Sequence, residues 1–318
     1  MVATILEKPK QKPKHQMDSL NNALSQVSMV SANFGNASVF EAVLGDWVQF
    51  LGGRPGEVVI VDGGSKPETH DLYWKLFKDR KIDKLQVIHS DHPENDKDKC
   101  YYQEHLVGAL AANPYVLFFK SDTLPYRQGH DSWLVEAIGY LDREDTFAVG
   151  GSFNIPSKHH EAWPGWYFSD KCSLNFALMK RTSFMKAMEE FAGEYIASGF
   201  RTTNPLPPIA RRYVMENAFE QYMKNHQLYT LTKVEDRTWT VFHTNVQGKP
   251  LVEVRENYLR RVNVEKYMNA RIYNRVWGGS YYGLPDLRWV HFKWKVSECL
   301  IHPIKRSIRR LLGKPAAG

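Results

Sequence analysis

The sequence predicts an α/β protein with a mostly parallel sheet and helices on both faces. Short apolar runs alternate with segments of helical periodicity from about residue 25 to about residue 150, a pattern typical of a parallel sheet. The clearest run is Val-Val-Ile-Val at residues 58–61, followed by Asp62 and a glycine pair, which predicts a buried strand that ends in a sharp turn. An apolar content of 43% and an aromatic content of 13% are ample for a packed core.

Seven strands and six helices are predicted in chain order. The helix that begins at Ser38 has a capping box with Glu41, and the helix that begins at Ser65 has one with Glu68. Gly52 ends the first of these helices. The strands are expected at residues 27–30, 58–61, 85–88, 115–119, near Phe147, 174–179 and 238–242. The helices are expected at residues 38–51, 65–77, 101–112, 133–141, 182–192 and from Glu216 onward.

The remaining segments predict less regular structure. Residues 1–24 hold a series of lysines and two prolines, and we expect a flexible basic arm. Residues 154–171 are rich in His, Trp and Pro and predict a loop. We expect the main domain over residues 25–245, and a basic, aromatic, mainly helical C-terminal extension over residues 246–318.

Composition excludes several classes of protein. The apolar runs are too short to span a bilayer, and no signal peptide is visible at the N-terminus. Cys100, Cys172 and Cys299 are scattered, without the paired spacing of a zinc or redox site. Unpaired thiols suit a reducing compartment, so we expect a cytoplasmic protein.

The positive charge belongs to the C-terminal extension. The chain has a net charge of +7, yet residues 255–318 alone, with 14 Lys or Arg and 4 Asp or Glu, carry +10. A basic tail suits an anionic membrane surface, nucleic acid or an acidic partner. No nucleic-acid-binding motif is visible, so we expect no nucleic acid partner.

The last residues predict a short basic amphipathic helix after Pro303. Its apolar face would hold Ile304, Ile308, Leu311 and Leu312, and its basic face Lys305, Arg306, Arg309 and Arg310. Such a helix can attach a protein to an anionic membrane surface, which predicts a peripheral membrane protein. The alternative is that the apolar face packs on the main domain and that the basic face is only solvated.

Four motifs in order resemble the family 2 glycosyltransferases of the GT-A fold, over residues 25–245. Residues 61–65, Val-Asp-Gly-Gly-Ser, resemble the nucleotide-binding turn of that family. Residues 111–122 resemble the strand that leads to its DxD motif, and residues 216–220 its Glu-Asp motif. Residues 241–243, Val-Phe-His, resemble a later strand that ends in a histidine. The resemblance implies a Rossmann-like GT-A fold and a nucleotide-sugar donor.

The resemblance assigns roles around the donor. Asp62 would contact the base or ribose, and Asp122 and His243 would hold a divalent cation, Mn²⁺ or Mg²⁺. The structural alternatives are a turn residue, a strand-end cap and a satisfied strand-end histidine. Lys120 stands at the first acidic position of DxD, where its ammonium would weaken cation binding and could pair with a phosphate instead. The residues implied to bind the nucleotide-sugar are Ala32, Phe34, Asp62, Lys120, Ser121 and Asp122.

The catalytic pair implied by the Glu-Asp motif is Glu216 and Asn217. Asn217 cannot act as a base where the family has an aspartate, so Glu216 is preferred. Glu216 could alternatively only complement the helix dipole. Glu220, one helical turn further, and Asp170 and His160 in the aromatic segment are the other candidates for the base.

Two functions follow from these motifs. The first is an inverting glycosyltransferase that moves a sugar onto a glycan or lipid-linked acceptor, as in polysaccharide biosynthesis. The second is a non-catalytic relative that binds a nucleotide-sugar or a partner protein, which Lys120 and Asn217 favour. Trp163 and Trp166 in residues 159–167 could line an acceptor pocket, or could be buried anchors of an irregular segment.

Overall fold

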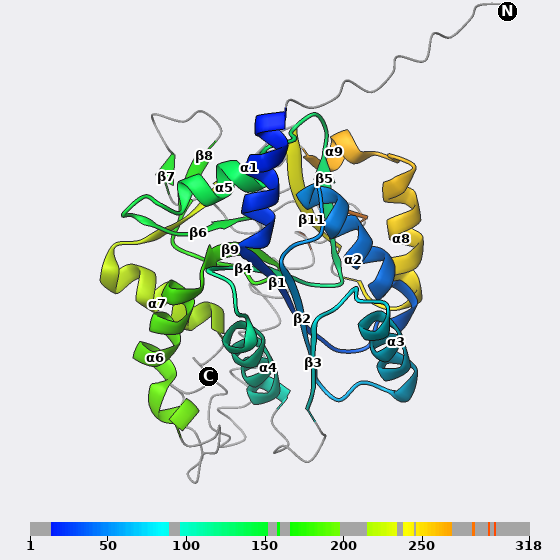
Figure 1. The fold of residues 1–318 in the computed structure, drawn as a ribbon, viewed down its shortest axis with the longest axis horizontal. Coiled ribbons are helices and arrows are strands. Elements are labelled where there is room, and N and C mark those ends of the chain that lie inside the picture. The colour runs from blue at the N-terminus through cyan, green and yellow to red at the C-terminus, as the bar shows by residue number, and fades with distance from the viewer. Residues whose placement is uncertain are drawn as a thin grey trace, which may run out of the picture.

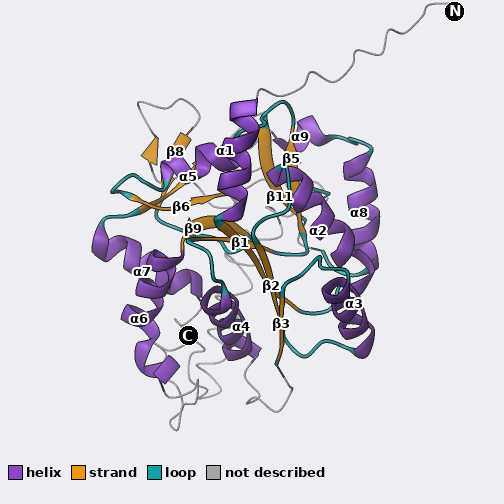
Figure 2. Ribbon diagram, viewed as in Figure 1, coloured by secondary structure: helices purple, strands orange, loops and turns teal. Residues whose placement is uncertain are grey.

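A nine-stranded sheet lies between two groups of helices (Figures 1 and 2). The computed structural model describes residues 14–88, 96–151, 158–159, 166–197, 215–233, 238–244, 246–268, 282–283, 292 and 296. The strand order in the large sheet is β3-β2-β1-β4-β9-β6-β10-β8-β7, and β11 pairs with β5 in a separate two-stranded ribbon.

One half of the large sheet is parallel, as the sequence predicts. It contains β3 (Lys84–Val87), β2 (Glu57–Asp62), β1 (Val27–Asn33) and β4 (Tyr115–Phe119), in that spatial order. Every neighbouring pair among these strands is parallel, and Asn33 lies opposite Asp62. Strands β1, β2 and β4 therefore end at one edge of the sheet. The predicted α/β class is confirmed.

The other half of the sheet is mixed. Strand β9 (Phe176–Lys180) lies antiparallel between β4 and β6 (Thr146–Gly150). Strand β10 (Tyr229–Lys233) is parallel to β6 and antiparallel to β8 (Trp166–Ser169), which pairs with β7 (Lys158–His159).

The prediction of a loop over residues 154–171 is wrong at Trp166–Ser169, which form strand β8. Trp166 is buried there, with its ring 4.8 Å from Tyr140 and 6.1 Å from Trp239. The strand pairs with β10, about 60 residues later, and with the two-residue strand β7 in the same segment, and its local composition gave no strand signal. Trp166 is thus a buried anchor. Trp163 and His160 lie outside the described residues.

Helices cover both faces of the sheet (Figure 1), as predicted. Val58 and Ile60 of β2 belong to one core cluster, whereas Val59 and Val61 belong to the other, because successive side chains on a strand point to opposite faces. The first cluster includes residues of α1 (Lys14–Ser25), α2 (Ala37–Leu51), α3 (Pro67–Lys78) and α5 (Trp133–Tyr140). The second includes residues of α4 (Asp96–Leu110), α6 (Arg181–Ala197) and α7 (Met215–His226).

Part of the predicted N-terminal arm is a helix. Helix α1 spans Lys14–Ser25, and Leu20, Ala23 and Leu24 are buried in the first core cluster. The prediction of a flexible arm over residues 1–24 is therefore wrong from Lys14 onward, because those three apolar residues pack into the core of the domain. Residues 1–13 lie outside the described part of the chain.

Neither predicted capping box forms. Helix α2 begins at Ala37 after Asn36, and Glu41 instead accepts hydrogen bonds from Lys75 and Lys81. Helix α3 begins at Pro67, and the Ser65 hydroxyl bonds to Asp62 instead. Glu41 is thus used by partners distant in sequence, whereas Ser65 is used by the turn that precedes the helix.

The ribbon and the first part of the C-terminal extension pack together. Strand β5 (Thr123–Arg127), which contains Pro125 and was not predicted, pairs with β11 (Trp239–His243). Helices α8 (Lys249–Leu259) and α9 (Val264–Met268) cover this ribbon through a small apolar cluster. Its buried members are Leu124, Tyr126, Phe242, Tyr258, Val264, Met268 and Tyr282.

Two predictions about membranes concern different parts of the chain. No helix within the described residues has both the length and the apolar character needed to cross a bilayer. The amphipathic helix predicted after Pro303 lies outside the described residues, so attachment to a membrane surface stays a prediction.

Candidate functional site

Three turns follow the parallel strands at one edge of the sheet. They come after β1, β2 and β4, and they contain Phe34, Asp62 and Asp122 respectively. Strand β9 runs antiparallel to β4 and begins at this edge, where Phe176 lies opposite Phe119. Strand β11 ends beside the third turn, where His243 lies opposite Thr123. Ligands of open α/β sheets bind at the carboxyl ends of the strands, so this edge is the candidate site.

The turn after β2 is organised by the Asp62 carboxylate. Its Oδ2 accepts hydrogen bonds from the backbone N–H groups of Gly64 at 2.9 Å and Ser65 at 2.7 Å, and lies 2.9 Å from His70 Nε2. Its Oδ1 accepts the Ser65 hydroxyl. Gly64 has φ of +85°, a conformation that favours glycine. The carboxylate therefore fixes the turn and places His70 beside it.

Asp62 exposes no part of its side chain. This is the arrangement expected of a turn residue, and the contact with a base or ribose that the resemblance implies stays a prediction. His70 has 30% of its side chain exposed and reaches the surface from the same cluster.

The first turn is tied to the second. Asn33 Nδ2 donates to the Gly35 carbonyl at 2.9 Å and to the Tyr73 hydroxyl, and Gly35 N–H donates to Ser65 Oγ at 2.7 Å. Of the two residues assigned to this turn by resemblance, Ala32 is partly buried in β1, whereas Phe34 is 62% exposed. An exposed aromatic ring at the strand ends is free to contact a planar ligand.

The Lys120-Ser121-Asp122 turn is held from both sides. The Thr123 N–H and hydroxyl donate to the Lys120 carbonyl at 3.1 and 2.6 Å. The Thr244 N–H and hydroxyl donate to the Asp122 carbonyl at 3.0 and 2.9 Å. The end of β11 therefore positions the Asp122 backbone.

Asn36 connects this turn to two other segments, and no sequence motif identified it. Its Nδ2 donates to Ser121 Oγ at 2.8 Å, and its Oδ1 accepts the Gly248 N–H, at the start of α8, at 2.9 Å. Ser121, which the resemblance assigned to donor binding, is buried and used in this link. Asn36 has φ of 61°, the left-handed conformation that asparagine tolerates better than most residues. An asparagine after Gly35 was therefore the sequence feature that could have indicated a left-handed turn residue here.

Asp122 and His243 are brought together although 121 residues separate them. His243 Nε2 lies 3.1 Å from Asp122 Oδ2. Asp122 Oδ1 is buried and has no hydrogen-bond partner in the described part of the chain.

An orphaned carboxylate oxygen beside an imidazole suits a hard divalent cation. No group of three or more His, Cys, Asp or Glu residues that could hold a metal occurs among the described residues. Two protein ligands fit a cation such as Mg²⁺, which usually keeps waters and substrate phosphates as its other ligands.

Lys120 forms an ion pair with a residue that the sequence analysis missed. Its Nζ lies 3.3 Å from Glu104 Oε1, on α4. The charge of Glu104 raises the pKa of Lys120 against the effect of burial, and Glu216 and Asp122 raise it further. Burial raises the pKa of Glu104, although Lys120 opposes that shift. Glu104 belongs to no motif, and only the packing of α4 against the sheet brings it here.

Glu216 belongs to the same cluster. It lies in the first turn of α7, where its Oε1 accepts the Ser173 hydroxyl at 3.1 Å and the Leu174 N–H at 3.0 Å. Its charge acts on both Lys120 and Glu104. The predicted base is thus near enough to the predicted phosphate-binding lysine for its charge to raise the pKa of that lysine.

The other candidates for the base lie as follows. Asn217 and Glu220 are partly buried on α7, and Asp170 is exposed after β8. Glu216 is the candidate among these whose charge acts on Lys120 and Glu104.

Comparisons with known proteins find similarity among solved structures. No protein-family model matches the sequence, and no curated protein matches it. Among solved structures, a similar chain is a mannosyltransferase from Pyrobaculum calidifontis in complex with GDP-mannose and Mn²⁺. The identity is 13%, the match covers 64% of this chain and 72% of that chain, and the TM-score is 0.36. We therefore base the functional argument on the residues of the site.

Proposed function

We propose that this chain is a glycosyltransferase that moves a sugar from a nucleotide-diphosphate donor to an acceptor hydroxyl, with inversion. The observation that carries the proposal is the contact of Asp122 with His243 just after β4, close in sequence to Lys120, whose pKa the charge of Glu216 helps to raise. A cation, a carboxylate with an orphaned oxygen and a second carboxylate are the groups that such a transfer needs.

The reaction divides these groups into two roles. The acceptor oxygen forms a bond to the anomeric carbon while the bond from that carbon to the phosphate oxygen breaks, and the diphosphate leaves with the electron pair. Lys120, which is 36% exposed and charged, would stabilise the departing diphosphate.

Glu216 would take the proton of the acceptor hydroxyl. The two donors on its Oε1 hold the carboxylate in one orientation, and Oε2 accepts no hydrogen bond from the described residues. An oriented carboxylate with one oxygen available is what a general base requires.

A divalent cation would add to this charge. Asp122 and His243 would hold it, and Mn²⁺ or Mg²⁺ would offset the negative charge of the diphosphate. Lys120 beside Asp122 would weaken that binding, although its pairing with Glu104 reduces the repulsion.

The acceptor is proposed to be a glycan or a lipid-linked sugar. A lipid-linked acceptor would suit the basic helix predicted after Pro303, since enzyme and acceptor would share one membrane surface. Phe34 is the residue that we assign to the donor base, because its ring is exposed at the strand ends.

A second function is favoured by the surroundings of Glu216. Its Oε1 is used to hold Ser173 and Leu174, as a purely structural carboxylate would be, and Asn217 replaces the aspartate of the resembled motif. These features suit a non-catalytic protein that binds a nucleotide-sugar or a partner.

Replacement of Glu216 separates the two functions. Transfer and hydrolysis are measured across a panel of nucleotide-sugars, and Glu216→Gln should lower turnover about 10²–10⁴-fold, the usual cost of losing a general base. Donor affinity, measured by calorimetry, should stay within about twofold because the amide keeps the acceptor oxygen of Oε1.

Glu220→Gln is the matched control, one helical turn further on α7, and it should keep nearly full activity. Parent-like turnover of Glu216→Gln would move the base to Glu220, Asp170 or His160. Donor binding without turnover of any donor in the panel would support the non-catalytic function.

A further inference from the structure

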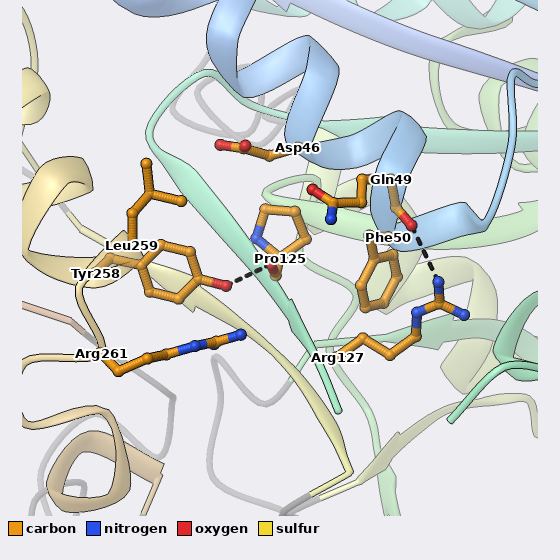
Figure 3. A pocket seen from close by; sticks show the side chains of 8 residues that line it. All are labelled: Asp46, Gln49, Phe50, Pro125, Arg127, Tyr258, Leu259 and Arg261. Carbon is orange, nitrogen blue, oxygen red and sulfur yellow. Dashed lines mark hydrogen bonds between the residues drawn. The ribbon is translucent and has the colours of Figure 1, made fainter. Parts of the chain in front are cut away.

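We propose that the chain has a second ligand site, for a small organic anion that carries a carboxylate or phosphate group. The site is a cavity of about 200 Å³ between α2, β5 and the C-terminal end of α8 (Figure 3). The residues that line it are Asp46, Gln49, Phe50, Pro125, Arg127, Tyr258, Leu259 and Arg261. This inference is independent of the proposed function.

Of the guanidinium groups that line the cavity, one has no carboxylate partner among the described residues. Asp46 is held by both nitrogens of one edge of Arg255, at 2.7 and 2.8 Å. Arg127 donates to the carbonyls of Gln49 at 3.0 Å and His130 at 2.9 Å, and lies 3.6 Å from Asp131. Among the residues that the structure describes, Arg261 is the arginine of the cavity lining that has no carboxylate partner.

Arg261 is held by aromatic rings instead. Its guanidinium carbon lies 4.6 Å from the centre of the Tyr126 ring and 5.8 Å from that of Tyr258. It forms no ion pair within the part of the chain that the structure describes. The Tyr258 hydroxyl donates to the Pro125 carbonyl at 2.6 Å, which fixes that ring. Figure 3 shows the Arg261 side chain extended along the Tyr258 ring toward the interior of the cavity.

The backbone at Arg261 adds a second observation. The Arg261 N–H donates to Tyr258 O at 2.9 Å and the Val262 N–H to Asn257 O at 3.0 Å, which is the Schellman pattern at the end of α8. Arg261 has φ of 60° at the position of this motif where glycine is usual. Arg80 has the same conformation, with φ of 57°, at the end of α3, so the conformation of Arg261 orients its side chain but is not peculiar to the cavity.

The walls of the cavity define the ligand class. Phe50, Pro125 and Leu259 supply apolar surface, and Gln49 supplies an amide. A guanidinium binds carboxylate and phosphate oxygens in a planar, two-pronged manner. The ligand is therefore an anion with a small apolar body, such as an aromatic carboxylate or a phosphate monoester.

The cavity is separate from the candidate site but is built on the same elements. Strand β5 begins directly after Asp122 and ends at Arg127, so its length of about 13 Å separates them. Helices α2 and α8 begin on either side of Asn36, which bonds to Ser121 and Gly248. The candidate site is at the start of these elements and the cavity at their far end.

Calorimetry on the full chain tests the proposal with two probes, inorganic phosphate and benzoate. We expect saturable binding of at least one, and the preferred probe identifies the anionic group. Arg261→Gln should weaken that binding about tenfold or more, the effect of losing a charge-assisted hydrogen bond. Arg260→Gln is the matched control, because both arginines are exposed but Arg260 pairs with Glu256 and does not line the cavity. Its affinity should equal that of the parent.

Two further variants test whether the binding depends on Arg261 and not on the candidate site. If Arg261→Gln does not fold, Arg261→Lys keeps the charge and removes the planar fork, and it should still weaken binding severalfold. Lys120→Gln separates this site from the candidate site, where Lys120 is proposed to bind a phosphate group. The binding that remains in Lys120→Gln is the binding that the Arg261 variants should weaken. Absence of saturable binding at millimolar concentrations would overturn the proposal. Binding that Lys120→Gln abolishes, or that both Arg261 variants retain, would also overturn it.

Discussion

Asp62 occupies the position of a ligand contact but has the surroundings of a turn residue. It follows a buried strand at the edge where ligands bind, yet its carboxylate is buried and bonded to Gly64, Ser65 and His70. Ser65 in turn accepts the Gly35 N–H from the neighbouring turn. The carboxylate therefore supports both turns that a nucleotide would contact.

Asp62→Asn should lower stability together with nucleotide affinity. The amide loses the charge and places one NH₂ group against backbone N–H donors, at a cost of about 1–3 kcal/mol in the free energy of unfolding. Chemical denaturation measures the stability, and calorimetry with nucleoside diphosphates measures the affinity. Asp71→Asn, an exposed site on α3, is the control and should change neither. Lost affinity with unchanged stability would instead indicate a direct contact.

Lys120 places a permanent cation beside the predicted metal ligands. Because its pKa is raised by Glu104, it stays charged throughout the pH range of any assay. Its partial exposure allows the ammonium to contact a phosphate group.

Nucleoside diphosphate binding should therefore survive excess EDTA. In EDTA, Lys120→Met should weaken this binding by about 10- to 100-fold, which corresponds to one charge-assisted hydrogen bond. Lys171→Met, an exposed lysine, should have no effect. Complete loss of binding in EDTA, restored by Mn²⁺, would show that Asp122 and His243 hold a metal that Lys120 does not replace.

At the scale of elements, Glu57 joins three strands and the segment before β4 at the edge opposite the candidate site. It lies at the start of β2, and its Oε2 accepts the Ser28 hydroxyl of β1 at 2.6 Å and the Ala112 N–H before β4 at 2.8 Å. Its Oε1 lies 2.6 Å from Lys84 Nζ of β3. Burial alone would raise the pKa of Glu57, but Lys84, Ser28 and Ala112 together lower it.

A lowered pKa makes the contribution of Glu57 to stability depend on pH. The stabilisation is present above the pKa of the unfolded state, about 4.3, and is lost as pH falls through the lower pKa of the folded state. Glu57→Gln should lower the free energy of unfolding by about 1–2 kcal/mol at neutral pH. The loss is modest because Lys84 is partly solvated, which weakens its ion pair with Glu57. The difference from the parent should shrink in acid.

Denaturation at neutral and acidic pH measures this difference. Glu253→Gln, at an exposed position on α8, is the control and should match the parent at both pH values. A difference for Glu57→Gln that is the same at both values would mean that the loss is one of packing rather than of charge.

The element boundaries show where local signals were sufficient. Strand β4 begins and ends at the predicted residues 115–119, because an apolar run between Asn113-Pro114 and Lys120 has clear limits. Strands β5 and β10 were missed, because Pro125 and the alternating Thr residues of β10 give weak apolar signals. Both strands form only through pairing with strands that are distant in sequence.

At the scale of the whole molecule, the direction of strand β9 determines which edge of the sheet the preceding segment reaches. It enters antiparallel between β4 and β6, so the segment before it returns to the edge where β4 ends. Ser173 and Leu174 in that segment meet Glu216 of α7. A wholly parallel sheet would have placed the start of this strand at the opposite edge, away from Lys120.

The charge of the molecule is divided between its parts. Residues 255–318 carry the excess of positive charge, and most of them lie outside the described residues. The described part of this extension, α8 and α9, packs on the ribbon through the apolar cluster around Tyr258 and Tyr282 and supplies Arg261 to the cavity. For the remaining basic residues, contact with an anionic surface stays a prediction.

Local pattern determined the α/β class, the presence of parallel strands and the ends of the strands where Asp62, Lys120 and Asp122 lie. These follow from periodicity and turn residues, which depend on neighbours within a few positions. Only the tertiary structure decided that Glu104 pairs with Lys120, that Asn36 links Ser121 to Gly248, and that Asp62 is buried. The bonds of Asn36 join segments 85 and 212 residues apart, the pairing of Glu104 depends on the packing of α4 on the sheet, and the burial of Asp62 depends on the strands and turns around it. A single sequence carries no local signal for such packing.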